Sequence, residues 1–118
     1  MGAHLMAGPR SRKGWKSKAD KLWSQAILKR DVMCRKCTTK PAKHAHHIIS
    51  RRYHATRFVT ANGVGLCPAC HFYFHQNPVG SMAWLDTNLG KKHLETLNEL
   101  SQRVEKLDYA CICLNLES

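Results

Sequence analysis

Two pairs of cysteines with the spacing Cys-x-x-Cys constrain the fold of this chain more than any other feature of its sequence. Cys34 and Cys37 form the first pair, Cys67 and Cys70 form the second, and 29 residues separate the pairs. Four thiolates at this spacing suit a tetrahedral structural zinc ion, a site that leaves no coordination position open for chemistry. We therefore expect a zinc knuckle that joins two distant parts of the chain and closes the loop between them.

The length of 118 residues is enough for one small domain with a modest core. Six cysteines and eight histidines in so short a chain favour metal as a supplement to hydrophobic burial. No window approaches the roughly 18 to 20 apolar residues of a membrane span, and the N-terminus lacks the apolar core of a signal peptide. We predict a cytoplasmic protein without a membrane partner, a setting in which paired thiols hold zinc more often than they form disulfides.

The positive charge is concentrated in one half of the sequence. Residues 1–60 contain 15 basic and 2 acidic side chains, whereas residues 61–118 contain 4 basic and 6 acidic ones. A localised excess of this size favours a polyanion as partner, through neutralisation of phosphates and release of counterions. We predict nucleic acid as the partner, and a solubilising tail is the alternative.

We divide the chain into a flexible basic arm at residues 1–14, a single domain at residues 15–110 and a tail at residues 109–118. The arm combines glycine, proline and basic residues without periodicity, and its first residues are typical of an expression tag. The domain contains a motif core at residues 34–78 and a helical part at residues 80–108.

Two helices are predicted to flank the motif core. Residues 17–31 have an apolar side and a capping box made by Ser17 and Asp20. Residues 91–107 form an amphipathic helix, whose stripe we expect in the core rather than in a dimer seam because it is barely two heptads long. The residues of this stripe are Leu94, Leu97, Leu100 or Ser101, Val104 and Leu107.

Within the motif core, the predicted order is strand, loop, strand, helix. Residues 45–50, "AHHIIS", and residues 64–67, "VGLC", are favoured as short strands. Residues 68–76 are predicted to be helical, since Pro68 suits the first turn of a helix. The fold class is therefore α+β. In the tail, Cys111 and Cys113 alternate with apolar residues, which predicts a terminal packing strand, with a second zinc site as the alternative.

Four histidines are candidates for chemistry. His71 and His75 are four apart on the predicted helix, so both project from one face and can bind a single ion. His46 and His47 are neighbours in a predicted strand and point to opposite sides. We therefore expect one of the pair to be a third metal ligand and the other a general base that activates water. These parts suit metal-assisted hydrolysis of a phosphodiester.

The stretch from His46 to His75, "HHIISRRYHATRFVTANGVGLCPACHFYFH", resembles the HNH (ββα-metal) endonucleases. It has a paired histidine, an asparagine near the second strand and a histidine at the end of the helix, with spacing similar to the colicin-type nuclease motif. The two cysteine pairs resemble the zinc-bearing branch that is common in bacteriophages and in some restriction enzymes. "NGVGLCPACHFYFHQNP" with the following Trp84 is also similar to phage HNH proteins, including the lambdoid recombination nucleases. The resemblance covers about residues 34–78.

This resemblance implies a small ββα-metal core and a DNA endonuclease of weak sequence specificity. It implies that His46, His71 and His75 bind the catalytic ion, that His47 is the general base, and that Asn62 holds the loop and orients His47 by hydrogen bonding. Many members of the family have aspartate where His46 stands. Three imidazoles bind Mn²⁺, Ni²⁺, Co²⁺ or Zn²⁺ more readily than Mg²⁺, which prefers oxygen.

His44 and His54 have no position in this motif. We expect His44 to be an exposed residue that faces phosphate; the other possibility is that a slipped strand makes it an alternative metal ligand. Guanidinium groups match phosphate in a two-pronged geometry, and lysines contribute positive charge. The candidates for DNA binding are Arg51, Arg52, Arg57, Lys18, Lys21, Arg35 and Lys36.

Two other functions remain open at this point. One is a zinc-stabilised nucleic-acid-binding module without catalysis, and the other is an accessory subunit of phage DNA packaging or recombination that docks through its C-terminal helix. Proteins of those processes are then candidate partners, in the cytoplasm of a bacterial host. Because an enzyme with one site breaks both strands by two nicks or as two subunits, a monomer and a homodimer are both consistent with the sequence.

Overall fold

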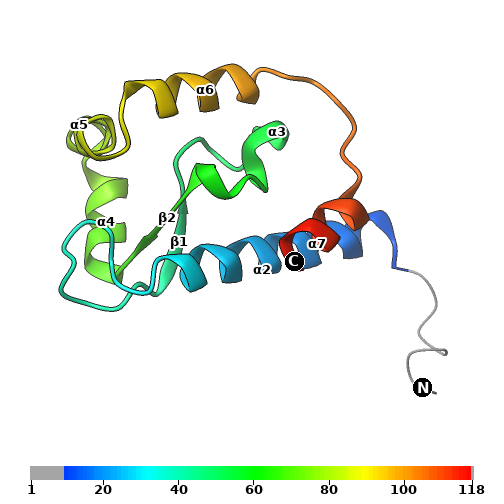
Figure 1. Ribbon diagram of the computed structural model, residues 1–118, viewed down its shortest axis with the longest axis horizontal. Coiled ribbons are helices and arrows are strands. Elements are labelled where there is room, and N and C mark those ends of the chain that lie inside the picture. Colours follow the sequence, from blue (N-terminus) through cyan, green and yellow to red (C-terminus); the bar gives the residue numbers. More distant parts are fainter. Residues whose placement is uncertain (1–9, 118) are drawn as a thin grey trace.

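The computed structural model describes residues 10–117, and within them the chain forms a two-stranded sheet surrounded by six α-helices (Figure 1). The predicted α+β class is confirmed, whereas residues 1–9 of the predicted arm lie outside the described residues. None of the described helices is long and apolar enough to cross a membrane. The elements in chain order are α2 (Arg12–Arg30), β1 (His44–His47), α3 (His54–Arg57), the 3₁₀ turn η1 (Thr60–Asn62), β2 (Gly63–Leu66), α4 (Pro68–Gln76), α5 (Pro78–Leu89), α6 (Lys91–Ser101) and α7 (Tyr109–Glu117).

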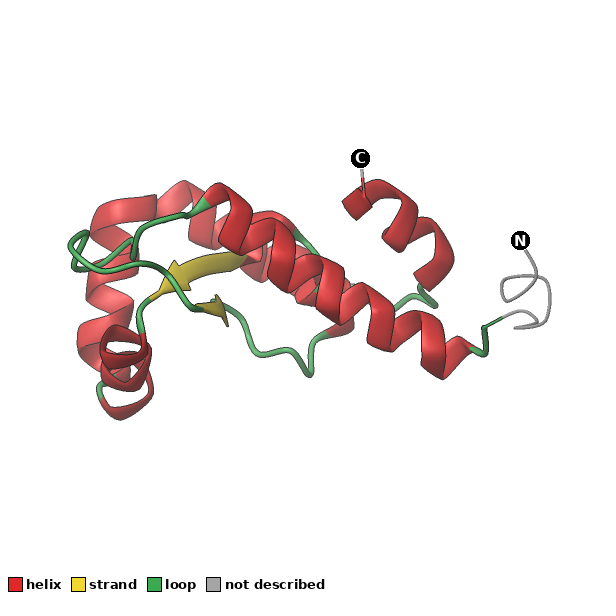
Figure 2. Ribbon diagram, turned by 90° about the horizontal axis from the view of Figure 1, so that it is seen from below, coloured by secondary structure: helices red, strands yellow, loops and turns green. Residues whose placement is uncertain are grey.

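The sheet lies between helix α2 and helix α4 (Figures 1 and 2). Strands β1 and β2 are antiparallel, with His44 opposite Leu66 and His47 opposite Gly63. Alternate residues of β2 point to opposite faces. Val64 and Leu66 are buried in a cluster with side chains of α4 and α5, while the glycines of β2 face α2.

The glycines of β2 allow α2 to lie directly against the strand. A Cβ atom at Gly63 would come within 2.5 Å of the Ile27 side chain, and one at Gly65 within 2.7 Å of the Asp31 Cβ atom. Both distances are shorter than any van der Waals contact, so a side chain at either position would push the helix away from the sheet. The close approach brings α2 into the region that contains the predicted catalytic residues.

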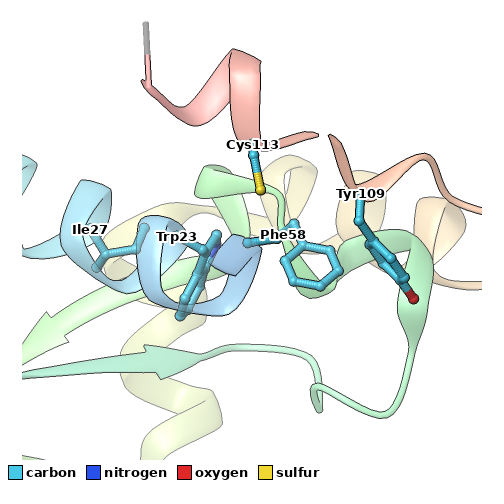
Figure 3. Close-up of a cluster of buried hydrophobic side chains, with 6 residues drawn as sticks. Trp23, Ile27, Phe58, Tyr109 and Cys113 are labelled. Atoms are coloured by element: carbon cyan, nitrogen blue, oxygen red, sulfur yellow. The ribbon is translucent and has the colours of Figure 1, made fainter. Parts of the chain in front are cut away.

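A second group of buried residues joins α2 to the C-terminal helix α7 (Figure 3). Its members are Ala19, Trp23, Ile27, Phe58, Tyr109 and Cys113. The prediction of a terminal strand is wrong, because residues 109–117 are helical. In a helix the spacing of four places Tyr109 and Cys113 on one face. Both are buried, whereas Cys111 between them is exposed.

The first helix begins earlier than predicted. Ser11 is its N-terminal cap, and the Ser11 hydroxyl accepts a hydrogen bond from the Gly14 amide at 3.0 Å. Ser17 therefore lies inside the helix and is exposed, so the predicted capping box with Asp20 is wrong. Serine followed three residues later by an acidic residue also occurs within helices, and here Ser11 supplies the cap instead.

The C-terminal helical part is interrupted twice. Gly90, with φ of 92°, separates α5 from α6, and α6 ends at Ser101 rather than near residue 107. Leu97 and Ser101 of the predicted stripe are buried, whereas Val104 is 99% exposed in the segment between α6 and α7. Leu107 packs against the cluster shared by α2 and α7. The stripe thus contributes to two different parts of the core.

Asp31, which follows the last residue of α2, connects that helix to the sheet. Its carboxylate accepts hydrogen bonds from Arg30 at 2.7 and 2.9 Å and from the Gly65 amide at 2.9 Å. Burial alone would raise the pKa of Asp31, but these hydrogen bonds and the nearby positive charges lower it below its ordinary value. Asp31 is therefore ionised in the folded protein.

We expect Asp31→Asn to lower the free energy of unfolding by about 2 kcal/mol. The NH₂ group of asparagine is a donor, and it would face N–H groups that now donate to the carboxylate. Since the folded-state pKa is lowered, the contribution of Asp31 is present above the unfolded-state pKa of about 3.9 and is lost as pH falls through the folded-state value. Urea unfolding should therefore show a difference in unfolding free energy between wild type and Asp31→Asn that becomes smaller below about pH 4. Asp86→Asn, an exposed change on α5, is the control, and a gap independent of pH would contradict this role.

The packing of α7 predicts different effects for the same change at two of its cysteines. Cys113→Ser replaces a thiol that lies 3.6 Å from the Trp15 carbonyl by a shorter and more polar hydroxyl in an otherwise apolar cluster, and should cost about 1–3 kcal/mol of unfolding free energy. Cys111→Ser, on the exposed side, should change it by less than about 0.5 kcal/mol. Thermal or urea unfolding of the two variants measures the difference, and equal losses would be inconsistent with α7 packed on α2 through Cys113.

Candidate metal centres

The four cysteines of the two Cys-x-x-Cys pairs lie together. Their sulfur atoms are all within 4.8 Å of one another, and the Cys37 and Cys67 sulfurs are 3.9 Å apart. A tetrahedral zinc ion with zinc–sulfur distances of about 2.3 Å separates its sulfurs by about 3.8 Å. No disulfide joins any of the six cysteines. The cluster is therefore compatible with a structural zinc ion, as the spacing predicts.

Local structure explains how the second pair reaches this position. Cys67 caps helix α4, and its sulfur accepts a hydrogen bond from the Cys70 amide at 3.4 Å. Pro68 occupies the first turn, where a missing amide hydrogen has no cost. The first pair lies in the turn after α2, where the Arg35 amide donates to the Gly65 carbonyl of β2. The cluster thus ties that turn to the start of α4.

The protonation chemistry of these thiols fits a cation among them. Hydrogen bonds from the Thr39 hydroxyl and from backbone amides lower the pKa of Cys37 to about 5. Burial, followed by the neighbouring thiols, raises the pKa of Cys70 to about 12. Four thiolates in contact repel one another, and a divalent cation among them removes that repulsion and deprotonates the remaining thiols.

Three histidines form a second cluster between β1 and α4. One ring nitrogen of each of His46, His71 and His75 lies within 4.8 Å of the others, and the Nε2 atoms of His71 and His75 are 3.0 Å apart. The i, i+4 spacing on α4 puts His71 and His75 on one face, and His46 reaches that face from the strand. The structure thus brings together the three predicted metal ligands.

The histidine cluster is suited to bind a cation through neutral rings. Burial, followed by the nearby His71 and His75, lowers the pKa of His46 to about 4. Burial, followed by His75 and His44, also lowers the pKa of His71. A neutral imidazole offers a lone pair, so the donor set fits a borderline divalent ion such as Zn²⁺, Ni²⁺, Co²⁺ or Mn²⁺.

His47 lies on the other side of β1 and is held by two contacts. Its ring stacks on Trp23 with centroids 3.9 Å apart and planes 12° apart. Its Nε2 atom is 3.0 Å from the Arg57 carbonyl oxygen. A carbonyl only accepts, so Nε2 carries the hydrogen and Nδ1 keeps the free lone pair. Burial also lowers the pKa of His47, which keeps the ring neutral near pH 7.

Asn62 closes the loop between the two strands. Its completely buried side chain accepts from the Ile49 amide at 2.8 Å and donates to the Ile49 and Thr56 carbonyls at 3.1 Å each. The prediction that Asn62 holds the loop agrees with these bonds. Its predicted hydrogen bond to His47 is absent, however, because His47 donates from Nε2 to the Arg57 carbonyl instead.

An open hollow of about 500 Å³ connects the two sides of the site. Its lining includes the three clustered histidines and also His47, Ser50 and Arg51. The Arg51 side chain is 65% exposed and only 3.9 Å from Asp20, a loose ion pair that leaves its guanidinium accessible. Arg51 is the one predicted phosphate-binding arginine that lines the hollow with the clustered histidines.

The other predicted phosphate-binding residues differ in what they contact. Arg57 is buried and makes a two-pronged ion pair with Asp20 at 2.7 and 2.9 Å, so its predicted role with phosphate is replaced by a structural one. Arg52 is exposed beside Tyr53. Of the remaining candidates, Lys18 pairs with Glu117, Arg35 pairs with Asp31, Lys36 lies over Tyr73, and Lys21 is exposed.

Sequence reasoning missed two residues of α2 that contribute to the site. Trp23, on the apolar side of α2, contacts the His47 ring, and its indole nitrogen donates to the Val59 carbonyl at 2.9 Å. Asp20 was expected in a capping box, but it fixes Arg57, whose carbonyl contacts His47. The apolar pattern places Trp23 on the buried side of the helix, but no pattern specifies the partner across the fold.

We expect one tightly bound equivalent of zinc at the cysteine cluster, measured by elemental analysis after dialysis. Cys37→Ser should lose this zinc and unfold at a lower temperature, because the turn at residues 34–37 is then no longer tied to α4. The same change at Cys111, which lies on α7 away from the cluster, should keep it. A Cys37→Ser protein that retains its zinc would show that the cysteine cluster is not the site.

Comparison of the chain with family models, with curated proteins and with solved structures found no match. The function must therefore be inferred from the chemistry of the site itself. That chemistry comprises a closed four-thiol cluster, an open three-imidazole cluster and a separately held fourth imidazole beside the same hollow.

Proposed function

We propose that this protein is a metal-dependent endonuclease of the HNH type that hydrolyses phosphodiester bonds in DNA with weak sequence specificity. The observation that carries the proposal is the arrangement of four histidines around one hollow. His46, His71 and His75 share a side where one ion would fit, and His47 is held apart from them with a free ring nitrogen. One ligand set and one separate base are the parts that the reaction requires.

His47 would act as the general base through its Nδ1 atom. The hydrogen bond from Nε2 to the Arg57 carbonyl fixes the tautomer, and the stacked Trp23 ring restricts rotation. The free Nδ1 can then take a proton from a water molecule as that water attacks phosphorus. When the water has lost its proton to Nδ1, the positive charge of the imidazolium is stabilised by the Arg57 carbonyl oxygen, which already accepts a hydrogen bond from Nε2.

His46, His71 and His75 would hold a divalent ion, which would stabilise negative charge on the phosphate and on the leaving oxygen. Arg51 is the candidate to orient the phosphate, since its guanidinium lines the hollow and matches two phosphate oxygens. Arg57 supports the site from behind through Asp20 and its carbonyl. The four-cysteine cluster would bind a structural zinc ion and take no part in the reaction.

DNA as the substrate is supported by charge. The chain carries a formal charge of +11, and its basic residues are concentrated before residue 61. Helix α2 and the loop with Arg51 belong to this basic part, and both lie next to the histidines. A phosphate backbone that enters the hollow would therefore meet positive charge on its way.

We expect the wild-type protein to nick or linearise plasmid DNA with added Mn²⁺, Ni²⁺ or Mg²⁺, and His47→Ala to lower the rate at least 100-fold, the range of a lost general base. His47→Gln should be equally inactive although its amide can still donate to the Arg57 carbonyl. His54→Ala, at an exposed histidine that begins α3 outside the cluster, should cleave like wild type. Gel-based cleavage across duplex, branched, nicked and single-stranded DNA measures these rates.

Two outcomes would change the proposal. Equal cleavage by wild type and both His47 variants would show that the base is assigned wrongly. Salt-sensitive DNA binding without cleavage under any of the ions would instead favour a zinc-stabilised binding module. In each case, circular dichroism of the variants separates a loss of chemistry from a loss of folding.

A further inference from the structure

His44 lies beside the histidine cluster without belonging to it. It occupies the first position of β1, two residues before His46, so both side chains leave the same face of the strand. Helix α4 lies across that face. The Nδ1 atom of His44 is 2.9 Å from the Nδ1 atom of His71, and the two ring centroids are 4.9 Å apart. The sequence spacing predicts no such contact, because it depends on where α4 crosses the strand.

The two ring nitrogens of His71 face different partners. Its Nε2 atom lies inside the cluster, 3.0 Å from the Nε2 atom of His75. Its Nδ1 atom faces His44. A nitrogen that binds a cation must offer its lone pair, so a neutral His71 that ligates through Nε2 carries its hydrogen on Nδ1. That hydrogen can then be donated to Nδ1 of His44.

We propose that His44 is a positioning residue for the metal site: it accepts a hydrogen bond from Nδ1–H of His71 and thereby fixes the tautomer and ring orientation in which Nε2 of His71 faces the ion. The inference rests on the proposed metal site. Histidines that bind metals usually donate their second N–H to a carboxylate, a carbonyl or water. Among the described residues no carboxylate contacts His71, and His44 takes that place.

The geometry distinguishes this role from direct ligation. The three residues whose ring nitrogens come within 4.8 Å of one another are His46, His71 and His75, and His44 is not among them. The His44 ring meets His71 at the nitrogen that points away from His75. An ion placed at the Nε2 atoms would therefore have the whole His71 ring between itself and His44.

The exposed position of His44 makes it testable without damage to the core. Calorimetric titration of the full chain, with its structural zinc retained, measures binding of Ni²⁺ to wild type and variants. His71→Ala defines the signal of the histidine cluster. His44→Ala should weaken Ni²⁺ binding about 10- to 100-fold, the usual effect of removing such a partner. His44→Asn should restore most of the affinity, because its Oδ1 accepts near the position of Nδ1, and His54→Ala should bind like wild type.

The tautomer gives a second measurement that a merely structural role would not change. With Zn²⁺ in excess, long-range ¹H–¹⁵N correlation spectra should show the hydrogen of His71 on Nδ1 in wild type and in His44→Asn. Broadening or loss of this single form is expected in His44→Ala. Both readouts are independent of DNA cleavage.

Each outcome of these measurements decides the role of His44. Unchanged Ni²⁺ affinity in His44→Ala would overturn the positioning role while leaving the metal site intact. A loss as large as that of His71→Ala, without rescue by asparagine, would make His44 a direct ligand and overturn it as well. If wild type and His71→Ala bind Ni²⁺ equally, the metal site and this inference both fail.

Discussion

The geometry of the site depends most on the buried amide of Asn62. Three hydrogen bonds of this side chain connect both ends of the loop between β1 and β2, and Asn62 is completely buried. The donated bond to the Thr56 carbonyl fixes the turn of chain just before Arg57. The Arg57 carbonyl is thereby held against His47. A shorter side chain or one without both a donor and an acceptor would leave buried backbone groups unpaired, and His47 would lose the contact that sets its tautomer.

Helix α2 supplies the second support, although it precedes the predicted motif core at residues 34–78. It can approach the sheet only because β2 has glycines at positions 63 and 65. The approach places Trp23 on the face of the His47 ring and Asp20 on the Arg57 guanidinium. His47 is thus held on its face by α2 and at its edge by the loop. Helix α7 packs on the same helix, against the cluster that contains Trp23 and Ile27.

Local patterns in the sequence predicted the two clusters but not their surroundings. Two Cys-x-x-Cys pairs and an i, i+4 histidine pair have geometries set by a turn or by one helix, so spacing alone predicted each pair, whereas the choice of His46 as third ligand rested on the resemblance to HNH nucleases. The alternating pattern around Cys111 and Cys113 was misleading, because in a short apolar segment the partner surface decides between strand and helix. The same limit applies to Arg57, which looked free for phosphate until the fold brought it to Asp20. The contact between His44 and His71 likewise joins residues 27 positions apart.

The two candidate metal centres are mechanically linked through α4. Cys67 and Cys70 belong to the start of this helix, and His71 follows in the next position. A zinc ion among the four thiols would therefore fix the rotation of α4 about its axis, and this rotation decides whether His71 and His75 face His46. Phe74 on the same helix is buried against Leu66 and Leu85, which supports that rotation from the apolar side. A closed site without an open coordination position would thus orient the proposed ligands of the open one.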